Sequence, residues 1–238
     1  MTHVAHPYIQ RIGINRGWKS RWFTTNPAKF REYLRVDAAL RKMLKTRLKG
    51  MSVDALEIER SAEGIRLVIK TSRPGIVIGR SGEGITKLKK EVDLFLRKQK
   101  MSEPLELKID IEEIRSPESS AQIVGQMIAE GLEKRMTFRR VMKQTAEKVM
   151  ANRDVEGVRI ILSGRLGGTD MARKEELKKG RIPLQTLRAD IDFARVEANL
   201  PYGVIGIKVW IYRGQVFEDR KAGQKDQAPR SPSRQSTK

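Results

Sequence analysis

The chain has 238 residues, enough for one large domain or two ordinary ones, each able to bury a core. Its 49 Lys and Arg against 29 Asp and Glu give a net charge of +20, which favours nucleic acid, before an anionic membrane, over a small-molecule substrate. The chain has no cysteine and only two histidines, His3 and His6, so we predict no disulfide, metal site or cofactor. Because no apolar run comes near the roughly 18 residues of a membrane span, we predict a soluble cytoplasmic protein.

The chain begins with its most basic part: residues 1–50 hold 12 Lys or Arg and 2 Asp or Glu. We predict a basic N-terminal arm over residues 1–26. Its stretch "INRGWKSRWF" interleaves cations with aromatic rings, which suits phosphate contacts beside stacking on bases. The same tryptophans could instead pack the arm onto a core, and the sequence leaves both interpretations open. The RNA contacts predicted in the arm are Arg16, Lys19, Arg21 and Trp22.

The first long helix is predicted to begin at Asn26-Pro27, an N-cap followed by a first-turn proline, and to end at Gly50. Alternating apolar residues in "DALEIER" and "IRLVIK" then predict two strands joined by a short turn, and "LELKIDIEEI" predicts a third strand over 105–114. The helix positions expected to face inward are Phe30, Leu34, Leu40, Leu44 and Leu48.

Between the second and third strands, "IVIGRSGEGITKLKK" places three glycines after an apolar run and before a helical pattern. Such a turn lets backbone amides point at phosphate oxygens. A nucleotide-binding P-loop needs a lysine where Ile85 stands, so that interpretation is rejected. The pattern resembles a KH-domain loop, in which Gly79-Arg80-Ser81-Gly82 would clamp a nucleic-acid backbone beside Lys87 on a basic helix. An ordinary strand-to-helix turn is the alternative.

The predicted fold class is α+β. The order helix, strand, strand, short helix with glycine loop, helix, strand is that of a type II KH domain (αββααβ), expected over 27–115. A second α+β domain over 116–217 is expected to pack two helices, to about 135 and from 138 to 150, on an antiparallel sheet. Its strands are predicted at 158–163, at 182–198 with an interruption, and at 204–212. Residues 218–238 have almost no apolar side chains, which predicts disorder.

Two further groups of cations stand out in the second domain. On its second helix, Arg139, Arg140 and Lys143 fall three and four residues apart and form a basic stripe, which is more often simply the solvated face of a helix. Farther on, Gly164 to Gly168, "GRLGG", indicates a turn facing phosphate or a tight connection that uses positive φ. The RNA contacts predicted here are Arg165 in the turn with Arg173 and Arg181, and Arg188 is also available nearby.

Two carboxylates raise the question of catalysis. Asp190 and Asp192 lie two apart on a predicted strand and share a face, as the metal ligands of a nuclease would. Without histidine or further acidic ligands nearby, we expect them to pair with arginines, and Arg188 and Arg195 are close in the sequence. No catalytic residue and no enzyme activity are predicted.

Four stretches resemble the bacterial small-subunit ribosomal protein three family: "TSRPGIVIGRSGEGI", "FRRVMK", "SGRLGGTDMARKEELKKGRIPLQTLRADIDFA" and "YGVIGIKVWIYRG". The match runs in order from about residue 13 to 214, and the third stretch is specific to this family. The resemblance implies a structural, non-enzymatic constituent of the small-subunit head, located on the cytoplasmic ribosome. A free-standing KH regulator of RNA is the alternative.

The resemblance also implies partners and roles. They are small-subunit ribosomal RNA, messenger RNA, and proteins ten and fourteen of the same subunit, with no membrane and no small-molecule substrate. It implies that Arg139, Arg140 and Lys143 line the tunnel through which messenger RNA enters and help to open structured messages. The arginines beside the "GRLGG" turn would touch ribosomal RNA or messenger.

Overall fold

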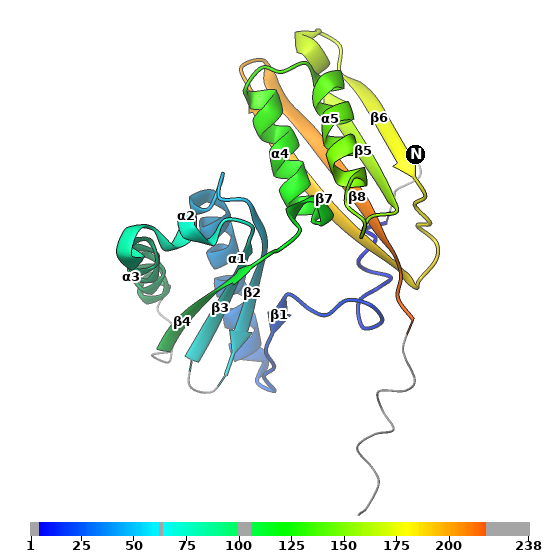
Figure 1. Ribbon diagram of the computed structural model, residues 1–238. Helices are drawn as coiled ribbons and strands as arrows, with labels where there is room; N and C mark the ends of the chain where they lie inside the picture. Colours follow the sequence, from blue (N-terminus) through cyan, green and yellow to red (C-terminus); the bar gives the residue numbers. More distant parts are fainter. Residues whose placement is uncertain (1–4, 62–63, 100–105, 218–238) are drawn as a thin grey trace, which may run out of the picture.

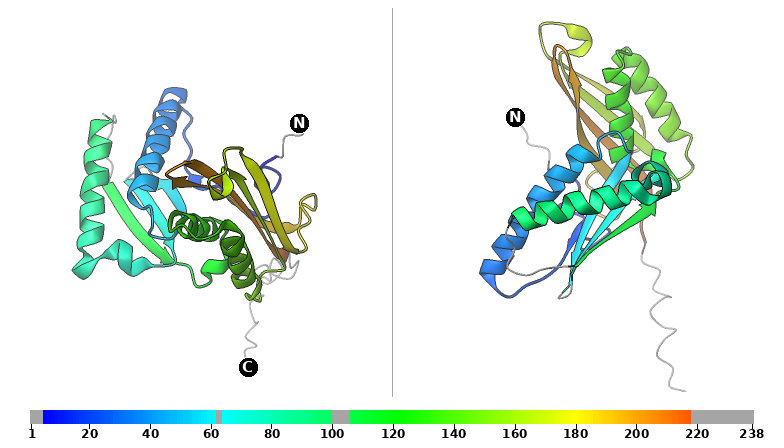
Figure 2. Two further views of the ribbon diagram at one scale, coloured as in Figure 1. Left: turned by 90° about the horizontal axis from the view of Figure 1, so that it is seen from above. Right: turned by 90° about the vertical axis from the view of Figure 1, so that its left-hand side faces the viewer.

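The computed structural model describes residues 5–61, 64–99 and 106–217. They form two α+β units side by side, each a four-stranded sheet with helices on one face, as Figure 1 and Figure 2 show. The predicted α+β fold class, with a KH unit followed by two helices on an antiparallel sheet, is confirmed. His3 and the predicted disordered tail, residues 218–238, lie outside the described residues.

The first unit, which we call the KH unit, has the predicted order αββααβ. Its sheet order is β1-β2-β3-β4, with β2 antiparallel to β3 and with β1 and β4 parallel to their neighbours. The elements are β1 (Ser20–Arg21), α1 (Pro27–Arg47), β2 (Val53–Arg60), β3 (Gly64–Thr71), α2 (Pro74–Ile78), α3 (Glu83–Lys98) and β4 (Glu106–Glu113).

Helix α1 begins as predicted, because the Asn26 side chain accepts a hydrogen bond from the Ala28 amide at 2.9 Å. Its later turns pack on the sheet, and Leu40 and Leu44 are fully buried. The inward prediction was wrong for the first turns, where Phe30 is 46% and Leu34 54% exposed. The core of the KH unit contacts α1 only from Val36 onward. The regular spacing of apolar residues in α1 therefore extends beyond the part of the helix that packs on the sheet.

The second unit, which we call the C-terminal unit, has an all-antiparallel sheet of order β6-β5-β8-β7. Helices α4 and α5 cover one face and bury the larger core (Figure 2). A smaller core on the other face includes Ile191, Trp210 and Tyr212. The elements are η2 (Pro117–Ser119), α4 (Ala121–Glu133), α5 (Phe138–Met150), β5 (Gly157–Gly164), η3 (Leu166–Gly168), β6 (Arg173–Gly180), β7 (Ala189–Leu200) and β8 (Gly203–Gln215).

The predicted strand at 182–198 was wrong in its first half. Residues 181–188 form an irregular connection, and the strand that precedes them, β6, was not predicted. Strand β6 is a sheet edge with the sequence RKEELKKG, so it lacks the alternation that reveals a half-buried strand. Ile182 and Leu184 are apolar because they pack on the smaller core, not because they pair in the sheet.

The N-terminal arm, described from residue 5 to residue 26, connects the two units. Arg11 is fully buried and donates hydrogen bonds to the carbonyl oxygens of Leu184 (2.8 Å), Thr186 (2.9 Å) and Ala189 (2.8 Å) in the C-terminal unit. Eight residues later the arm reaches the KH sheet, where the Ile58 amide donates to the Lys19 carbonyl at 3.0 Å. The arm therefore links the outer face of the C-terminal sheet to the β1–β2 edge of the KH sheet (Figure 1).

Candidate nucleic-acid interface

The glycine loop between α2 and α3 has a geometry that side chains would disturb. Gly79 has a φ of +74°, and a Cβ there would lie 2.9 Å from the Gly84 amide nitrogen. A Cβ on Gly84 would lie 2.5 Å from the Val77 carbonyl oxygen and 2.7 Å from that of Ile78. The two helices thus approach backbone to backbone, and the segment from Gly79 to Gly82 is left as a tight projecting turn.

The exposed side of this loop is rich in hydrogen-bond donors. Arg80 and Ser81 face solvent, and α3 starts at Glu83 without a side-chain cap on its first amides. Lys87 lies one turn along, 3.2 Å from Glu83, but both side chains are about two-thirds exposed, so this pair is weak. Backbone amides at a helix start, an arginine and a lysine can together hold a phosphate backbone.

Gly82→Asp tests this loop. Gly82 has a φ of +79° with open space around it, so Asp, which tolerates the left-handed region, is expected to cost only about 1–2 kcal/mol of stability. Its charge is expected to weaken single-stranded RNA binding about tenfold or more, as losing one charge-assisted hydrogen bond would. Filter binding measures the affinity and circular dichroism the fold. Gly82→Asn is the uncharged control, and equal RNA affinity of the two variants would contradict the clamp.

Three of the four RNA contacts predicted in the arm have partners within the protein. Arg16 lies 3.1 Å from Asp190 and 3.2 Å from Asp192, with its side chain only 21% exposed. Arg21 pairs with glutamates of β2. The Trp22 indole N–H donates to Asp37 at 2.8 Å. The fourth, Lys19, is exposed, and its ammonium group forms no ion pair with the residues that the structure describes.

The two interpretations of the arm's tryptophans divide between the two rings. Trp22 packs against Phe30 and Tyr33, with ring centroids 5.3 and 5.7 Å away, so it fixes the arm to α1. Trp18 is 65% exposed and Phe23 is 87% exposed. The rings free to stack on bases are therefore Trp18 and Phe23, not Trp22.

The basic stripe on α5 faces solvent. Val141, Met142 and Val149 are buried, while Arg139, Arg140 and Lys143 are exposed on the opposite face. Arg139 approaches Glu175 of β6 at 3.6 Å, but its side chain is 72% exposed, so this pair leaves the guanidinium accessible. The stripe is a linear row of cations on a rigid helix.

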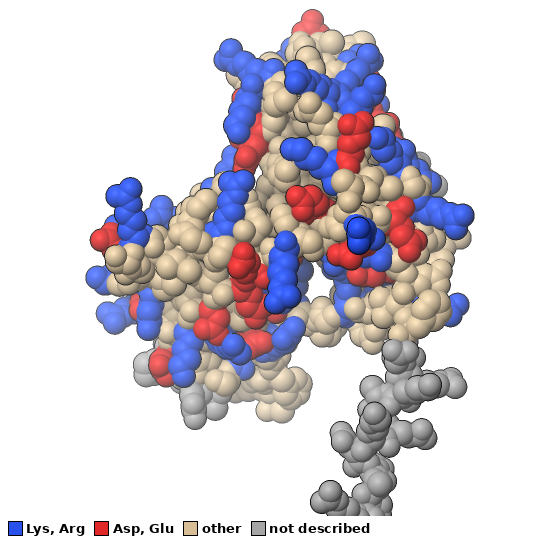
Figure 3. Space-filling model, viewed as in Figure 1, with Lys and Arg blue, Asp and Glu red and all other residues tan. Residues whose placement is uncertain are grey.

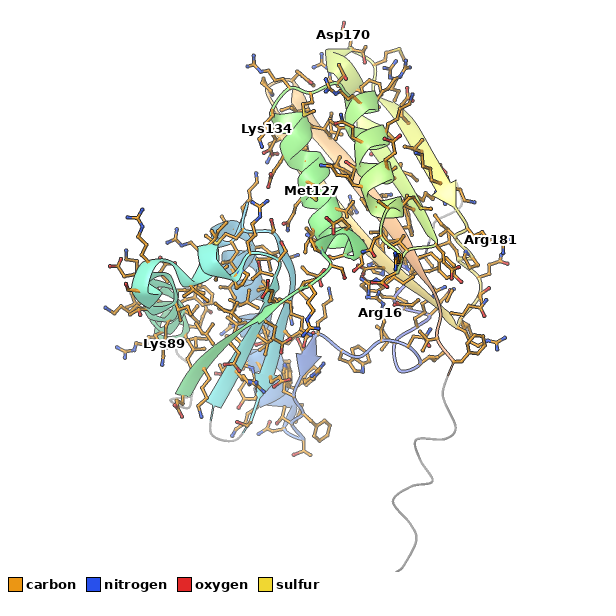
Figure 4. The ribbon with its side chains drawn as sticks, in the orientation of Figure 1. Arg16, Lys89, Met127, Lys134, Asp170 and Arg181 are labelled. Carbon is orange, nitrogen blue, oxygen red and sulfur yellow. The ribbon has the colours of Figure 1, made fainter. Side chains whose placement is uncertain are left out.

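The three arginines around the "GRLGG" turn are not brought together. Arg165 donates to the carbonyl oxygens of Thr169 (3.0 Å) and Tyr202 (3.2 Å) and to the Asp170 carboxylate (2.9 Å), so it holds the turn. Arg173 begins β6 and Arg181 follows its far end, where Figure 4 labels it well away from Asp170. The positive φ of Gly164, Gly167 and Gly168 supports the interpretation as a tight connection. Contact with phosphate stays a prediction, for which Arg173 is half exposed.

Asp190 and Asp192 pair with arginines as expected, but not with the predicted ones. Their partners are Arg16 of the arm and Arg213 of β8. Arg188 instead lies over the Phe217 ring, at 5.5 Å. The described residues contain no group of three or more acidic, His or Cys side chains that could hold a metal ion. Within the same ranges, no helix is long and apolar enough to cross a bilayer.

Charge is unevenly distributed over the surface. The KH sheet face away from its helices is covered by mutual ion pairs, such as Arg66 with Glu59 and Lys70 with Glu57. Figure 3 shows this mixed face and, above it, the cations that crowd the upper end of the C-terminal unit. The surfaces suited to polyanions are therefore the glycine loop with α3, and α5 with the end of the unit where that helix begins.

A KH unit with a glycine loop, joined to a second unit with an exposed basic helix, defines an RNA-binding protein of the KH class. Residues 39–119 match the "KH domain" family, and residues 128–211 match the family described as "Ribosomal protein S3, C-terminal domain". The second match is specific to one kind of KH protein.

Two curated relatives cover almost the whole chain. The small ribosomal subunit protein uS3 of Xanthomonas euvesicatoria pv. vesicatoria is 44% identical over 233 residues, which are 97% of this chain and 92% of the relative. That of Caldicellulosiruptor saccharolyticus is 44% identical over 222 residues, or 93% of this chain and 96% of the relative. The chain belongs to the small ribosomal subunit protein uS3 family.

Proposed function

We propose that this chain serves in its own ribosome as the relatives' name describes, as a structural, non-enzymatic constituent of the small subunit in the cytoplasm. Ribosomal RNA and neighbouring ribosomal proteins are its partners. The observation that carries this function is the pairing of a KH unit and a family-specific C-terminal unit in one chain, at 44% identity over nearly its whole length.

The proposal assigns RNA to the surfaces that stay accessible. Gly79, Arg80, Ser81 and Gly82 clamp the RNA backbone, with Lys87 adding charge, while Lys19 contributes from the arm. Arg16, Arg21 and Arg165 act mainly through the protein contacts described above. We also propose that the chain has four parts: an arm over residues 1–26, a KH domain over 27–115, a second domain over 116–217 and a tail over 218–238.

The proposal also places messenger RNA along α5. Arg139, Arg140 and Lys143 form an exposed row on a helix whose other face packs in the core. The backbone that carries these cations is therefore held in place. A fixed row of cations can hold a single strand after it melts and slow its re-pairing. We place this row in the tunnel through which messenger RNA enters, with proteins ten and fourteen of the subunit as neighbours.

Replacing Arg139, Arg140 and Lys143 with alanine tests the tunnel role. Alanine preserves helix propensity and leaves the buried face of α5 intact, so the subunit is expected to assemble. Translation through a stable hairpin is expected to slow several-fold more than translation of an unstructured message in the same reconstituted system. The matched control removes three exposed cations from α1, which has no assigned RNA contact, with Arg35, Lys42 and Lys45 changed to alanine. Equal slowing of both messages, or none, would contradict the role in opening hairpins.

Sedimentation of a tagged chain separates ribosomal assembly from a free-standing KH regulator. A ribosomal constituent is expected to sediment with the small subunit in sucrose gradients at low and at high salt. High salt screens exposed ionic contacts, but it has less effect on a protein that is buried among RNA and other proteins. A chain that remains at the top of the gradient in both salts would contradict the ribosomal function.

A further inference from the structure

A pocket of about 540 Å³, which we call the tip pocket, opens at the end of the C-terminal unit where α4 ends and α5 begins. Three connections meet there: the α4–α5 turn, the β5–β6 connection with η3, and the β7–β8 hairpin (Figure 1). Its lining is mainly apolar and includes Leu132, Met136, Phe138, Gly167, Pro201 and Tyr202. The volume lies in the range of small-ligand sites, about 300–1,000 Å³.

The walls of this tip pocket are held in place before any ligand arrives. Leu166 is fully buried and anchors η3 in the core. Arg165 donates to the Tyr202 carbonyl oxygen at 3.2 Å, which ties the β5–β6 connection to the hairpin. A Cβ on Gly168 would lie 3.9 Å from the Tyr202 ring, an ordinary van der Waals distance, so η3 neighbours this ring. Tyr202 is 38% exposed, which leaves part of its side chain accessible to a ligand.

The rim of the tip pocket is cationic. Arg135 contributes to the lining itself, with a positive φ of 61° that presents it beyond the end of α4. The guanidinium groups of Arg139 and Arg173 lie 5.6 and 5.4 Å from the Phe138 ring. Glu175 pairs loosely with both, at 3.6 and 3.8 Å, so these two arginines share one carboxylate. Figure 4 shows further charged side chains at this end, near Lys134 and Asp170.

We propose that the tip pocket binds one unpaired nucleobase of an RNA strand, stacked on Tyr202, with the flanking phosphates on Arg135, Arg139 and Arg173. This rests on the proposed RNA-binding function and extends it. Apolar walls with an exposed aromatic ring match the faces of a base, and a cationic rim matches the phosphates on either side of it. Because Arg139 belongs to the rim and to the α5 stripe, one strand can occupy both.

The test uses the full chain and two probes of equal length, an oligouridylate and the same ribose-phosphate strand without bases. Tyr202→Ala is expected to bind the oligouridylate about 5- to 100-fold more weakly than the parent, the loss that corresponds to one stacked base. The strand without bases is expected to bind both proteins equally. Tyr202→Phe keeps the ring and should bind as the parent does.

The controls separate the pocket from RNA binding in general. Val204→Ala removes a 55% exposed side chain from the same hairpin without touching the pocket lining and is expected to leave both affinities unchanged. If Tyr202→Ala binds oligouridylate as tightly as the parent, the base site is overturned, and a protein side chain becomes the better occupant. If the parent binds neither strand, the proposed RNA-binding function fails as well.

Discussion

Replacing Asp192 with alanine is expected to lower the free energy of unfolding by about 3–5 kcal/mol, the cost of breaking a buried ion pair from one side. Asp192 is 4% exposed and accepts hydrogen bonds from the Tyr8 hydroxyl, the Ala121 amide at 2.7 Å and Arg213 at 3.1 Å. Arg16 lies 3.2 Å away on the other oxygen. The variant leaves all of these donors in place without their acceptor.

Urea denaturation of the full chain without RNA measures this effect. Asp170→Ala is the matched control, because its side chain is fully exposed and makes one ion pair with Arg165, for which we expect less than about 1 kcal/mol. Since Tyr8 and Arg16 belong to the arm, Asp192→Ala should also make the arm easier to cleave by protease. A loss no larger than that of Asp170→Ala would show that the arm is held by other contacts.

The same carboxylate predicts a dependence on pH. Burial alone would raise the pKa of Asp192, but the charges of Arg16 and Arg213, with the Tyr8 hydroxyl and the Ala121 amide, outweigh it and lower the pKa. A lowered pKa stabilises the fold in full above the unfolded value, about 4, and this stability is lost as pH falls through the folded pKa. The difference between parent and Asp192→Asn should therefore be constant above about pH 5 and shrink below pH 4.

Comparison with the variant is needed because a second carboxylate works in the opposite direction. Asp54, on β2, accepts a hydrogen bond from the Ser120 hydroxyl at 2.6 Å, and its burial raises its pKa. Its protonation in acid favours the fold, so the parent alone mixes the two titrations. Subtracting the Asp192→Asn curve removes the part of the Asp54 contribution that burial causes, which both proteins share, and leaves the smaller part that comes from the charge of Asp192.

Local signals explain what the sequence predicted correctly. Asn26 and Pro27 mark the start of α1, and alternation marks β2 and β3, because each pattern depends on neighbours a few residues apart. The glycine loop was also recognisable, since its close approach involves Gly84 and carbonyl oxygens only six and seven residues before it. These features of the KH unit could be derived without knowing any long-range contact.

Long-range contacts explain the errors. Arg16 and Asp190 are 174 residues apart, so nothing in "INRGWKSRWF" distinguishes an arginine bound to a carboxylate from one free for phosphate. Arg188 and Arg195 are close to Asp192 along the chain, yet Arg213 reaches it from the next strand. Phe30 and Leu34 continue a regular apolar pattern beyond the sheet. The tip pocket could not be predicted from the sequence for the same reason, since its walls come from three separate connections.

Gly84→Ala is expected to damage the KH unit through geometry alone, without changing its charge. The new Cβ would lie 2.5 Å from the Val77 carbonyl oxygen and 2.7 Å from that of Ile78, and neither backbone atom can turn away as a side chain could. Helices α2 and α3 must then separate, at a cost of about 1–3 kcal/mol. The turn from Gly79 to Gly82 opens with them, and RNA affinity is expected to fall at least about tenfold.

Gly75→Ala gives the control for Gly84→Ala. Gly75 lies in α2 with an ordinary φ and nothing within 4 Å of a Cβ, so alanine there is expected to be neutral or stabilising by up to about 1 kcal/mol. Thermal denaturation and single-stranded RNA binding are measured on both variants and the parent. Because Gly82→Asp acts by charge and Gly84→Ala by shape, added salt should narrow the difference in affinity between the parent and the first variant but not between the parent and the second. If Gly84→Ala matches Gly75→Ala in stability and affinity, the close approach of α2 and α3 does not set the loop that binds RNA.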